Sequence, residues 1–241
     1  MKKYFLFSAF FITFVACYSC DDGRIYEKES LIPQDGLTLK FTGELKGVES
    51  WPGKYSVCLA GFNEESDYAI LSKVITASSS NEPIQLQMNG INKEISQVGL
   101  CVTNRLRKRI VTFAQLDKET ISTTKDTLRL TVGTLDVALF QSLQSEIFNS
   151  SCIACHGATG KAARNLFLTE GKSHAALIGQ PSKTIEGAIL VKPGNASESL
   201  LSRVLSEEGV LQHSHTDLLD AKKKSTLISL INDWIEAGAN K

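Results

Sequence analysis

The spacing of apolar residues changes near Gly133, and this change constrains the fold more than any other feature. Before Gly133, apolar and polar residues alternate in short runs, a pattern typical of β-strands. After it, apolar residues recur every four positions, as expected for a helix, at Leu135, Leu139, Leu143 and Ile147. The sequence therefore predicts a multidomain chain with an all-β N-terminal domain and an all-α C-terminal domain.

The alternating runs predict an immunoglobulin-like β-sandwich over residues 37–133. They cover residues 37–42, 55–62, 84–88, 98–103, 109–113 and 128–132, with turn residues between them. Cys58 and Cys101 fall in two of these predicted strands. In an exported domain they could form a disulfide. Alternatively, they are two separately buried thiols that behave as small apolar residues.

The first residues have the features of an export signal. Lys2 and Lys3 precede an apolar run over residues 4–15, which is too short to span a bilayer comfortably. We therefore expect residues 1–19 to be a signal peptide and residues 20–36, which hold Pro33 and Gly36 and show no periodicity, to be a tether.

The end of this signal resembles that of bacterial lipoproteins, in which a cysteine becomes the lipidated first residue. Residues 14–17 match the usual lipidation motif and favour Cys17, whereas cysteine pairing favours Cys20, since lipidation at Cys17 would leave Cys20 as a free thiol. Asp21 and Asp22 resemble the acidic tag of some surface-exported lipoproteins of Gram-negative bacteria, or simply begin a solvated linker. The resemblance implies an exported, membrane-anchored lipoprotein that faces the periplasm or the cell surface.

Residues 152–156 read Cys-Ile-Ala-Cys-His, which is the attachment motif of c-type haem. In this motif each thiol can bond one vinyl group, and the histidine is an axial iron ligand. The motif predicts one covalent haem c, held by Cys152, Cys155 and His156. A zinc site from these residues with His213 or His215 is a chemically sound alternative.

Further segments at matching offsets support a family resemblance. They are Leu166-Phe167-Leu168, Pro193-Gly194 followed by Ser199 and Leu201, and Trp234-Ile235 followed by Gly238-Ala239. Together with the haem motif they resemble the class I cytochrome c domains of bacterial exported proteins. The resemblance implies a cytochrome c-like domain over residues 134–241, with Trp234 filling its core.

The chain departs from that family at the sixth iron ligand, which is commonly a methionine before the last helix. The two methionines are Met1 and Met88, so the haem domain offers none. His213 and His215 stand where the family's methionine segment would be. We expect His215 rather than His213 to complete bis-histidine ligation, with Asp217 orienting a ring nitrogen. The alternative is a solvated turn with a five-coordinate or water-bound iron.

The predicted function is a membrane-tethered c-type cytochrome that carries single electrons between redox partner proteins, rather than an enzyme. A ligand-binding or adhesion lipoprotein with a subsidiary haem domain is the alternative. Twenty-six basic and 26 acidic residues give no basic field for nucleic acid. No hydrolase motif of the G-x-S-x-G or H-E-x-x-H type occurs, and no small-molecule substrate is indicated.

Overall fold

The computed structural model of the chain describes residues 36–76, 83–157 and 162–241. Residues 35–241 form one compact unit. The predicted signal peptide, most of the tether, and the two candidate lipidation sites Cys17 and Cys20 lie outside the described residues. In the described part, no helix combines the length and the apolar character needed to cross a membrane.

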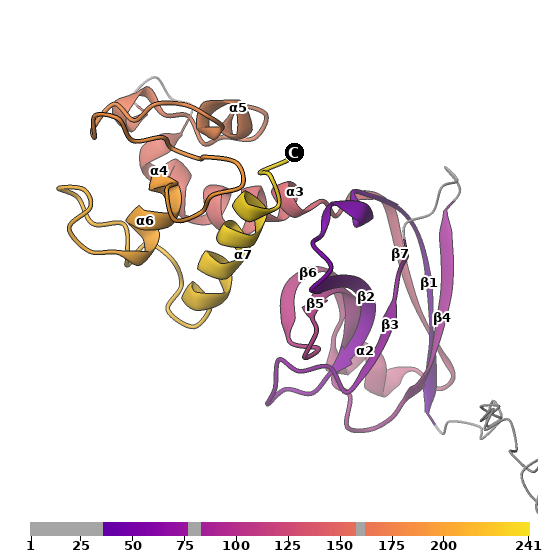
Figure 1. Cartoon of the computed structure of the whole chain (residues 1–241). Coiled ribbons are helices and arrows are strands. Elements are labelled where there is room, and N and C mark those ends of the chain that lie inside the picture. Colours follow the sequence, from indigo (N-terminus) through magenta and orange to yellow (C-terminus); the bar gives the residue numbers. More distant parts are fainter. Residues whose placement is uncertain (1–35, 77–82, 158–161) are drawn as a thin grey trace, which may run out of the picture. The chain divides into compact units, whose positions relative to one another are not determined.

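Two β-sheets make up the first part of the described chain (Figure 1). A three-stranded sheet has the order β4-β1-β7, and a four-stranded sheet has the order β3-β2-β5-β6. The strands are β1 (Leu37–Lys46), β2 (Tyr55–Phe62), β3 (Leu71–Val74), β4 (Ile84–Ile91), β5 (Gln97–Asn104), β6 (Arg109–Leu116) and β7 (Thr127–Asp136). Each of the six predicted runs lies within an observed strand. The short strand β3 and the helices η1 (Val48–Ser50) and α2 (Lys118–Thr123) were not predicted.

The alternating residues place one apolar face of each sheet in a shared core. Leu39 and Phe41 of β1, Leu59 of β2, Leu100 of β5 and Leu128 of β7 are almost fully buried in the same apolar cluster. Strand pairing is antiparallel except between β1 and β7, which run parallel. The chain is therefore β-rich in this part, as the period-two runs indicate.

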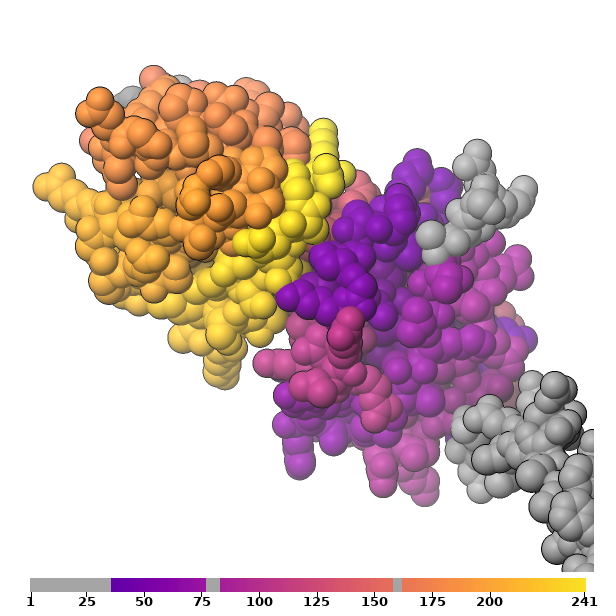
Figure 2. Space-filling view, viewed as in Figure 1, coloured from indigo at the N-terminus to yellow at the C-terminus, as the bar shows by residue number. Residues whose placement is uncertain are grey.

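A second, smaller apolar cluster contains the two cysteines of this part. Its members are Cys58, Ala60, Phe62, Ala69 and Cys101. The segment between β2 and β3 is held to β6 and to the turn before it, because Asp67 accepts from the guanidinium of Arg109 at 2.8 Å and Ala69 N donates to Arg107 O at 2.9 Å. The hairpin that joins β5 to β6 reaches the molecular surface, in the magenta region of Figure 2.

Helices and irregular chain make up the remainder. The helical elements are α3 (Leu139–Leu143), the π-helix η2 (Gln144–Cys152), α4 (Ile153–His156), η3 (Ala163–Asn165), α5 (Ser173–Leu177), α6 (Leu200–Ser206) and α7 (Lys224–Glu236). Leu135 belongs to β7, where it pairs with Leu45, so the predicted helix begins later than its apolar repeat indicates.

These observations correct the predicted fold class. The combination of an immunoglobulin-like sandwich with a large all-α cytochrome c-like domain is wrong. Strands in two sheets dominate the structure, and one sheet contains the parallel β1–β7 pair. Among the described residues after Asp136, α7 has 13 residues and the next longest α-helix has 7. Isolated β-bridges join the chain between α5 and α6, including Ile178 to Val191, because glycines at positive φ, Gly179 and Gly187, turn it back before a helix can extend.

Helix α7 forms as the sequence predicts, and it carries the core of this part. Its buried residues are Leu227, Leu230, Ile231, Trp234 and Ile235. The ring of Trp234 lies 5.3 Å from that of Phe140, and its Nε1 donates to Asn240 O at 2.7 Å. Trp234 is 1% exposed, so it fills the core.

Candidate functional site

The Cys-Ile-Ala-Cys-His motif of residues 152–156 lies at the junction of η2 and α4. Cys152 ends η2, and α4 is a single turn that ends at His156. Cys155 is exposed and Cys152 is half-buried, so a bound group can reach both thiols from solvent. Burial, with a smaller contribution from Cys155, raises the pKa of Cys152 to about 11. The Cys152 thiol is therefore protonated at neutral pH.

Gly157 follows the motif because no side chain fits there. A Cβ atom at this position would lie 2.6 Å from Ile153 O, well inside normal contact. The backbone of Gly157 is extended, which ends α4 directly after the histidine. The close approach fixes the direction in which the chain leaves His156.

Two hydrogen bonds to the following segment anchor His156. The Nδ1 of its ring lies 3.2 Å from Leu166 O, and Leu168 N donates to His156 O at 2.9 Å. A carbonyl only accepts, so Nδ1 carries the proton and the lone pair of the neutral ring lies on Nε2. Burial, together with the neighbouring His215, lowers the pKa of His156 below its ordinary value, although the bond to Leu166 opposes the shift. The neutral imidazole is the form that binds metals.

The structure places His215 beside His156. The two ring centroids lie 6.5 Å apart, with 28° between the ring planes. His215 is half-buried, and its Nδ1 lies 2.9 Å from His213 O, so it too has Nε2 free. Both histidines therefore share the arrangement typical of metal ligands, in which the other ring nitrogen donates to a carbonyl. His213 is exposed, and its ring lies 5.5 Å from that of His215.

A buried threonine and a glutamate hold the loop that carries His215. Thr216 is 4% exposed, and its hydroxyl donates to the carboxylate of Glu208. Ser214 Oγ donates to the same carboxylate at 3.1 Å, and these bonds lower the pKa of Glu208. Asp217 does not have the expected role of orienting a ring, because its carboxylate lies 3.8 Å from the ammonium of Lys224 and the carbonyl of His213 holds the His215 ring.

Gln144 connects η2, which ends at Cys152 of the motif, to two later segments of the chain. No sequence pattern points to this glutamine. Its side chain is 1% exposed. Its Nε2 donates to Leu168 O at 3.0 Å and to Asn149 Oδ1 at 2.8 Å, and its Oε1 accepts from the hydroxyl of Ser173. The amide thus joins η2 to the segment that contacts His156 and to α5. A lone glutamine in a helical run carries no signal that distinguishes it from a solvated one.

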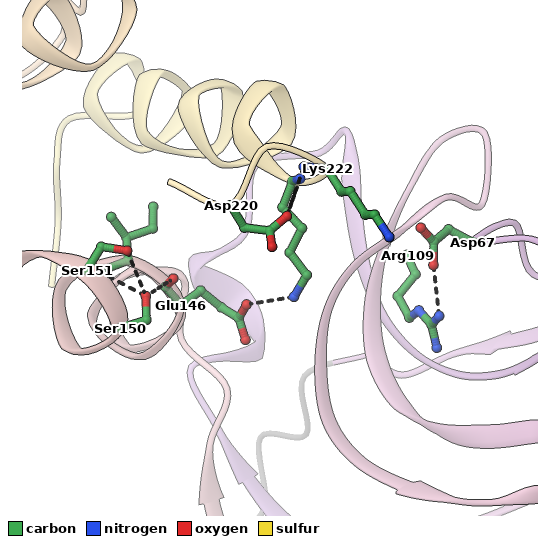
Figure 3. Close-up of polar contacts among 9 residues, drawn as sticks. Asp67, Arg109, Glu146, Ser150, Ser151, Asp220 and Lys222 are labelled. Carbon is green, nitrogen blue, oxygen red and sulfur yellow. Dashed lines mark hydrogen bonds and ion pairs between the residues drawn. The ribbon is translucent and has the colours of Figure 1, made fainter. Parts of the chain in front are cut away.

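Polar contacts also attach the segment before α7 to η2 (Figure 3). Lys223 Nζ lies 3.3 Å from the carboxylate of Glu146, and Ser150 Oγ donates to Glu146 O at 2.6 Å. The Oδ1 atom of Asp220 accepts from the backbone N–H groups of Lys222 and Lys223. The Lys223–Glu146 ion pair therefore joins the start of α7 to η2, the helix that ends in Cys152.

His174 has a structural role. Its ring lies 4.9 Å from the ring of Phe140 in an edge-on contact, and its Nε2 lies 2.9 Å from Ala239 O. Both Phe140 and Trp234 pack against it. The histidine therefore links α5 to the C-terminal end of α7.

Cys58 and Cys101 lie directly opposite each other on β2 and β5. Their Sγ atoms are 3.8 Å apart, and both side chains are buried. The structure brings together the two thiols that the sequence offers as a disulfide.

In the described ranges, no group of three or more His, Cys, Asp or Glu side chains is placed to hold a metal ion. A haem iron takes only one or two ligands from the protein, so two imidazoles suffice for it. The chain matches no protein-family model, and no curated protein is similar to it.

Proposed function

We propose that the chain carries single electrons through one haem c, attached at Cys152 and Cys155 and ligated by His156 and His215. The observation that supports this most is the pair of imidazoles with a ring separation of 6.5 Å. Metal–nitrogen bonds are about 2 Å long, so two rings that share one metal have ligating nitrogens about 4 Å apart. Ring centroids lie beyond those nitrogens, and the observed separation leaves room for one iron.

The thiols and imidazoles of the candidate site fit a haem in three respects. Both thiols of the motif are open to solvent at least in part, as two bonds to one porphyrin require. Both candidate imidazoles direct Nδ1 to a carbonyl and keep Nε2 for a metal. The lowered pKa of His156 keeps its ring neutral at pH values where an ordinary histidine begins to gain a proton.

When bound, the group would supply a one-electron iron couple, which no side chain of the protein provides. The residues of the chain hold it, set its potential and restrict access to it. If His215 rather than a methionine binds the iron together with His156, the potential would be lower, since thioether ligation raises it. Because His156 and His215 would both bind the iron, they would leave no site for oxygen or peroxide, which favours an electron carrier over a redox enzyme.

The same proposal includes the location of the protein, which its first residues would determine. Residues 1–19 would direct export, and a lipid on Cys20, or alternatively on Cys17, would hold the chain at a membrane of a Gram-negative bacterium. An oxidising compartment outside the cytosol is also where c-type haem attachment and structural disulfides are formed. Redox proteins at the same membrane would be the partners.

Covalent attachment is the part of the proposal that is easiest to test. The full chain is expressed with its signal in a host that assembles c-type cytochromes, and haem is stained after denaturing electrophoresis. We expect the wild-type band to stain and the Cys152→Ala/Cys155→Ala variant to lose the stain. Cys58→Ala, which alters a thiol outside the motif, should keep it. An unstained wild-type band, or a stain that survives in the double variant, would refute the proposal.

A further inference from the structure

A cavity of about 450 Å³ lies between the β5–β6 hairpin and α7, away from the residues of the haem motif. Ligand sites are commonly about 300–1,000 Å³, so the volume suits a small molecule. All of its lining residues belong to the compact unit of residues 35–241. The polar side chains that line it include Lys54, Arg105, Lys108, Ser225, Thr226 and Ser229.

The positive charge of the cavity comes from Lys54, Arg105 and Lys108. Lys54 forms an ion pair with Asp233, which offsets its charge. Among the described residues, no carboxylate lies within ion-pair distance of Arg105 or Lys108. No Asp or Glu lines the cavity itself. The cavity therefore has two cations whose charge no described carboxylate balances.

The hairpin tip holds these two cations in a fixed loop. The side-chain oxygen of Asn104 accepts from Leu106 N at 3.0 Å and from Lys108 N at 2.9 Å. Asn104 N donates to Lys108 O at 3.0 Å, and Arg107 adopts a left-handed φ of 61° that closes the turn. In Figure 2 this magenta tip stands at the surface. Because the backbone is already ordered, a ligand would bind without ordering the loop.

Neutral donors line the opposite wall. Ser225, Thr226 and Ser229 present hydroxyl groups from α7. Tyr55 Oη donates to Asp233 at 2.5 Å, and burial together with this bond raises the Tyr55 pKa above its ordinary value, so the phenol stays uncharged. Hydroxyl and ammonium donors around an open volume are suited to oxygen anions.

Two apolar side chains complete the lining. Ile110 is buried at the base of the hairpin, and Leu106 at its tip is 72% exposed. A bare inorganic ion would use neither, and it would fill little of the volume. The combination fits a molecule with an anionic end and a small apolar body.

We propose that this cavity binds a small organic anion that carries phosphoryl or carboxylate groups. Arg105 and Lys108 contact the anionic groups, the hydroxyl groups of α7 donate to their oxygens, and Leu106 covers the apolar body. The site uses none of the residues assigned to the haem, so its test is independent of the proposed electron transfer.

Titration calorimetry with phenyl phosphate and with benzoate, which each join an anionic group to a small apolar body, tests the site at low and at high salt on the exported full-length chain. We expect at least one of the two to bind, more weakly at high salt because the interactions are between charged groups. Tighter binding of phenyl phosphate would identify a phosphoryl ligand, and tighter binding of benzoate a carboxylate ligand. In the Arg105→Gln/Lys108→Gln variant, affinity should fall about tenfold for each of the two charges that the substitutions remove.

The matched control is Arg129→Gln/Lys125→Gln, which removes the same charges at two exposed positions outside the cavity. It should bind both probes as the wild type does. Failure of both probes to bind, or equal weakening in the two double variants, would overturn the assignment. All four altered positions lie on loops or strand surfaces, and thermal unfolding of each variant checks that it folds.

Discussion

The imidazole rings of His156 and His215 lie 6.5 Å apart, and each has a backbone carbonyl at its Nδ1. If both bind one iron, removing either changes its coordination. His215→Ala should convert a low-spin reduced spectrum to a high-spin one and open the iron to carbon monoxide. Absorbance spectra of the reduced protein, with and without carbon monoxide, measure this change.

His213→Ala is the matched control for that prediction. His213 is exposed and contributes its carbonyl, not its ring, to the position of His215. Since alanine keeps the carbonyl, the spectrum should stay low-spin. A low-spin spectrum in His215→Ala together with a high-spin one in His213→Ala would reverse the assignment of the two histidines.

Gly157 is expected to tolerate no larger residue. In Gly157→Ala the new Cβ would meet Ile153 O at 2.6 Å, so the backbone must shift, at a cost of about 1–3 kcal/mol in the free energy of unfolding. Gly53→Ala places its Cβ where nothing lies within 4 Å, and it should change stability by less than about 0.5 kcal/mol. Urea unfolding compares the two. Equal stability would show that α4 ends without the close contact.

The strands could be predicted from the sequence because the alternation of apolar and polar residues is visible within each short segment. β2 begins and ends at the predicted residues, Tyr55 and Phe62, since a turn with Pro52 and Gly53 precedes a run that is apolar except at Ser56 and Gly61. The sequence does not predict β3, because its four residues, Leu71–Val74, are too few to show a period. Leu135 fitted a helical repeat by coincidence, whereas its place is set by pairing with Leu45, ninety residues earlier in the chain.

Some residues of the candidate site could likewise be predicted from the sequence, and others could not. Cys152, Cys155 and His156 could be found from their spacing, and His215 from its position in the chain. The groups that hold the rings could not, because the acceptors are the backbone carbonyls of Leu166 and His213, which every residue type has. Tertiary packing also decided the fold class, since glycine turns and β-bridges occupy the chain between α5 and α6 in a region expected to be all-α.

Cys58 and Cys101 should form a disulfide when the chain is exported. Their Sγ atoms are 3.8 Å apart on neighbouring strands, so small side-chain rotations bring them to bonding distance. Each thiol would lose a proton and an electron to a disulfide of an exported thiol oxidoreductase. The bond would close a loop between positions 43 apart, which stabilises a fold by about 2–4 kcal/mol. Mass spectrometry under non-reducing conditions, and unfolding with and without reductant, check this. Two alkylatable thiols in the exported, unfolded protein would contradict it.

The stability of the haem-free chain should fall as the pH is lowered. Burial lowers the pKa of His156, so the folded state binds a proton more weakly than the unfolded state, whose histidine titrates at about 6.5. The stabilisation is present above that value and is lost as the pH falls through the folded-state pKa. Chain made in the cytosol without residues 1–19 is unfolded with urea between pH 8 and pH 5. His156→Gln should show a shallower dependence, and an unchanged dependence would assign the effect to other groups.

The measurement that tests the central claim most directly is an absorbance and electron paramagnetic resonance spectrum of the exported, purified wild-type chain. Haem that remains bound through denaturation, with the low-spin signature of two imidazole ligands, is the result expected from the paired His156 and His215. A colourless protein from a host competent in cytochrome c assembly would contradict the account, and so would a covalent haem that is high-spin at neutral pH.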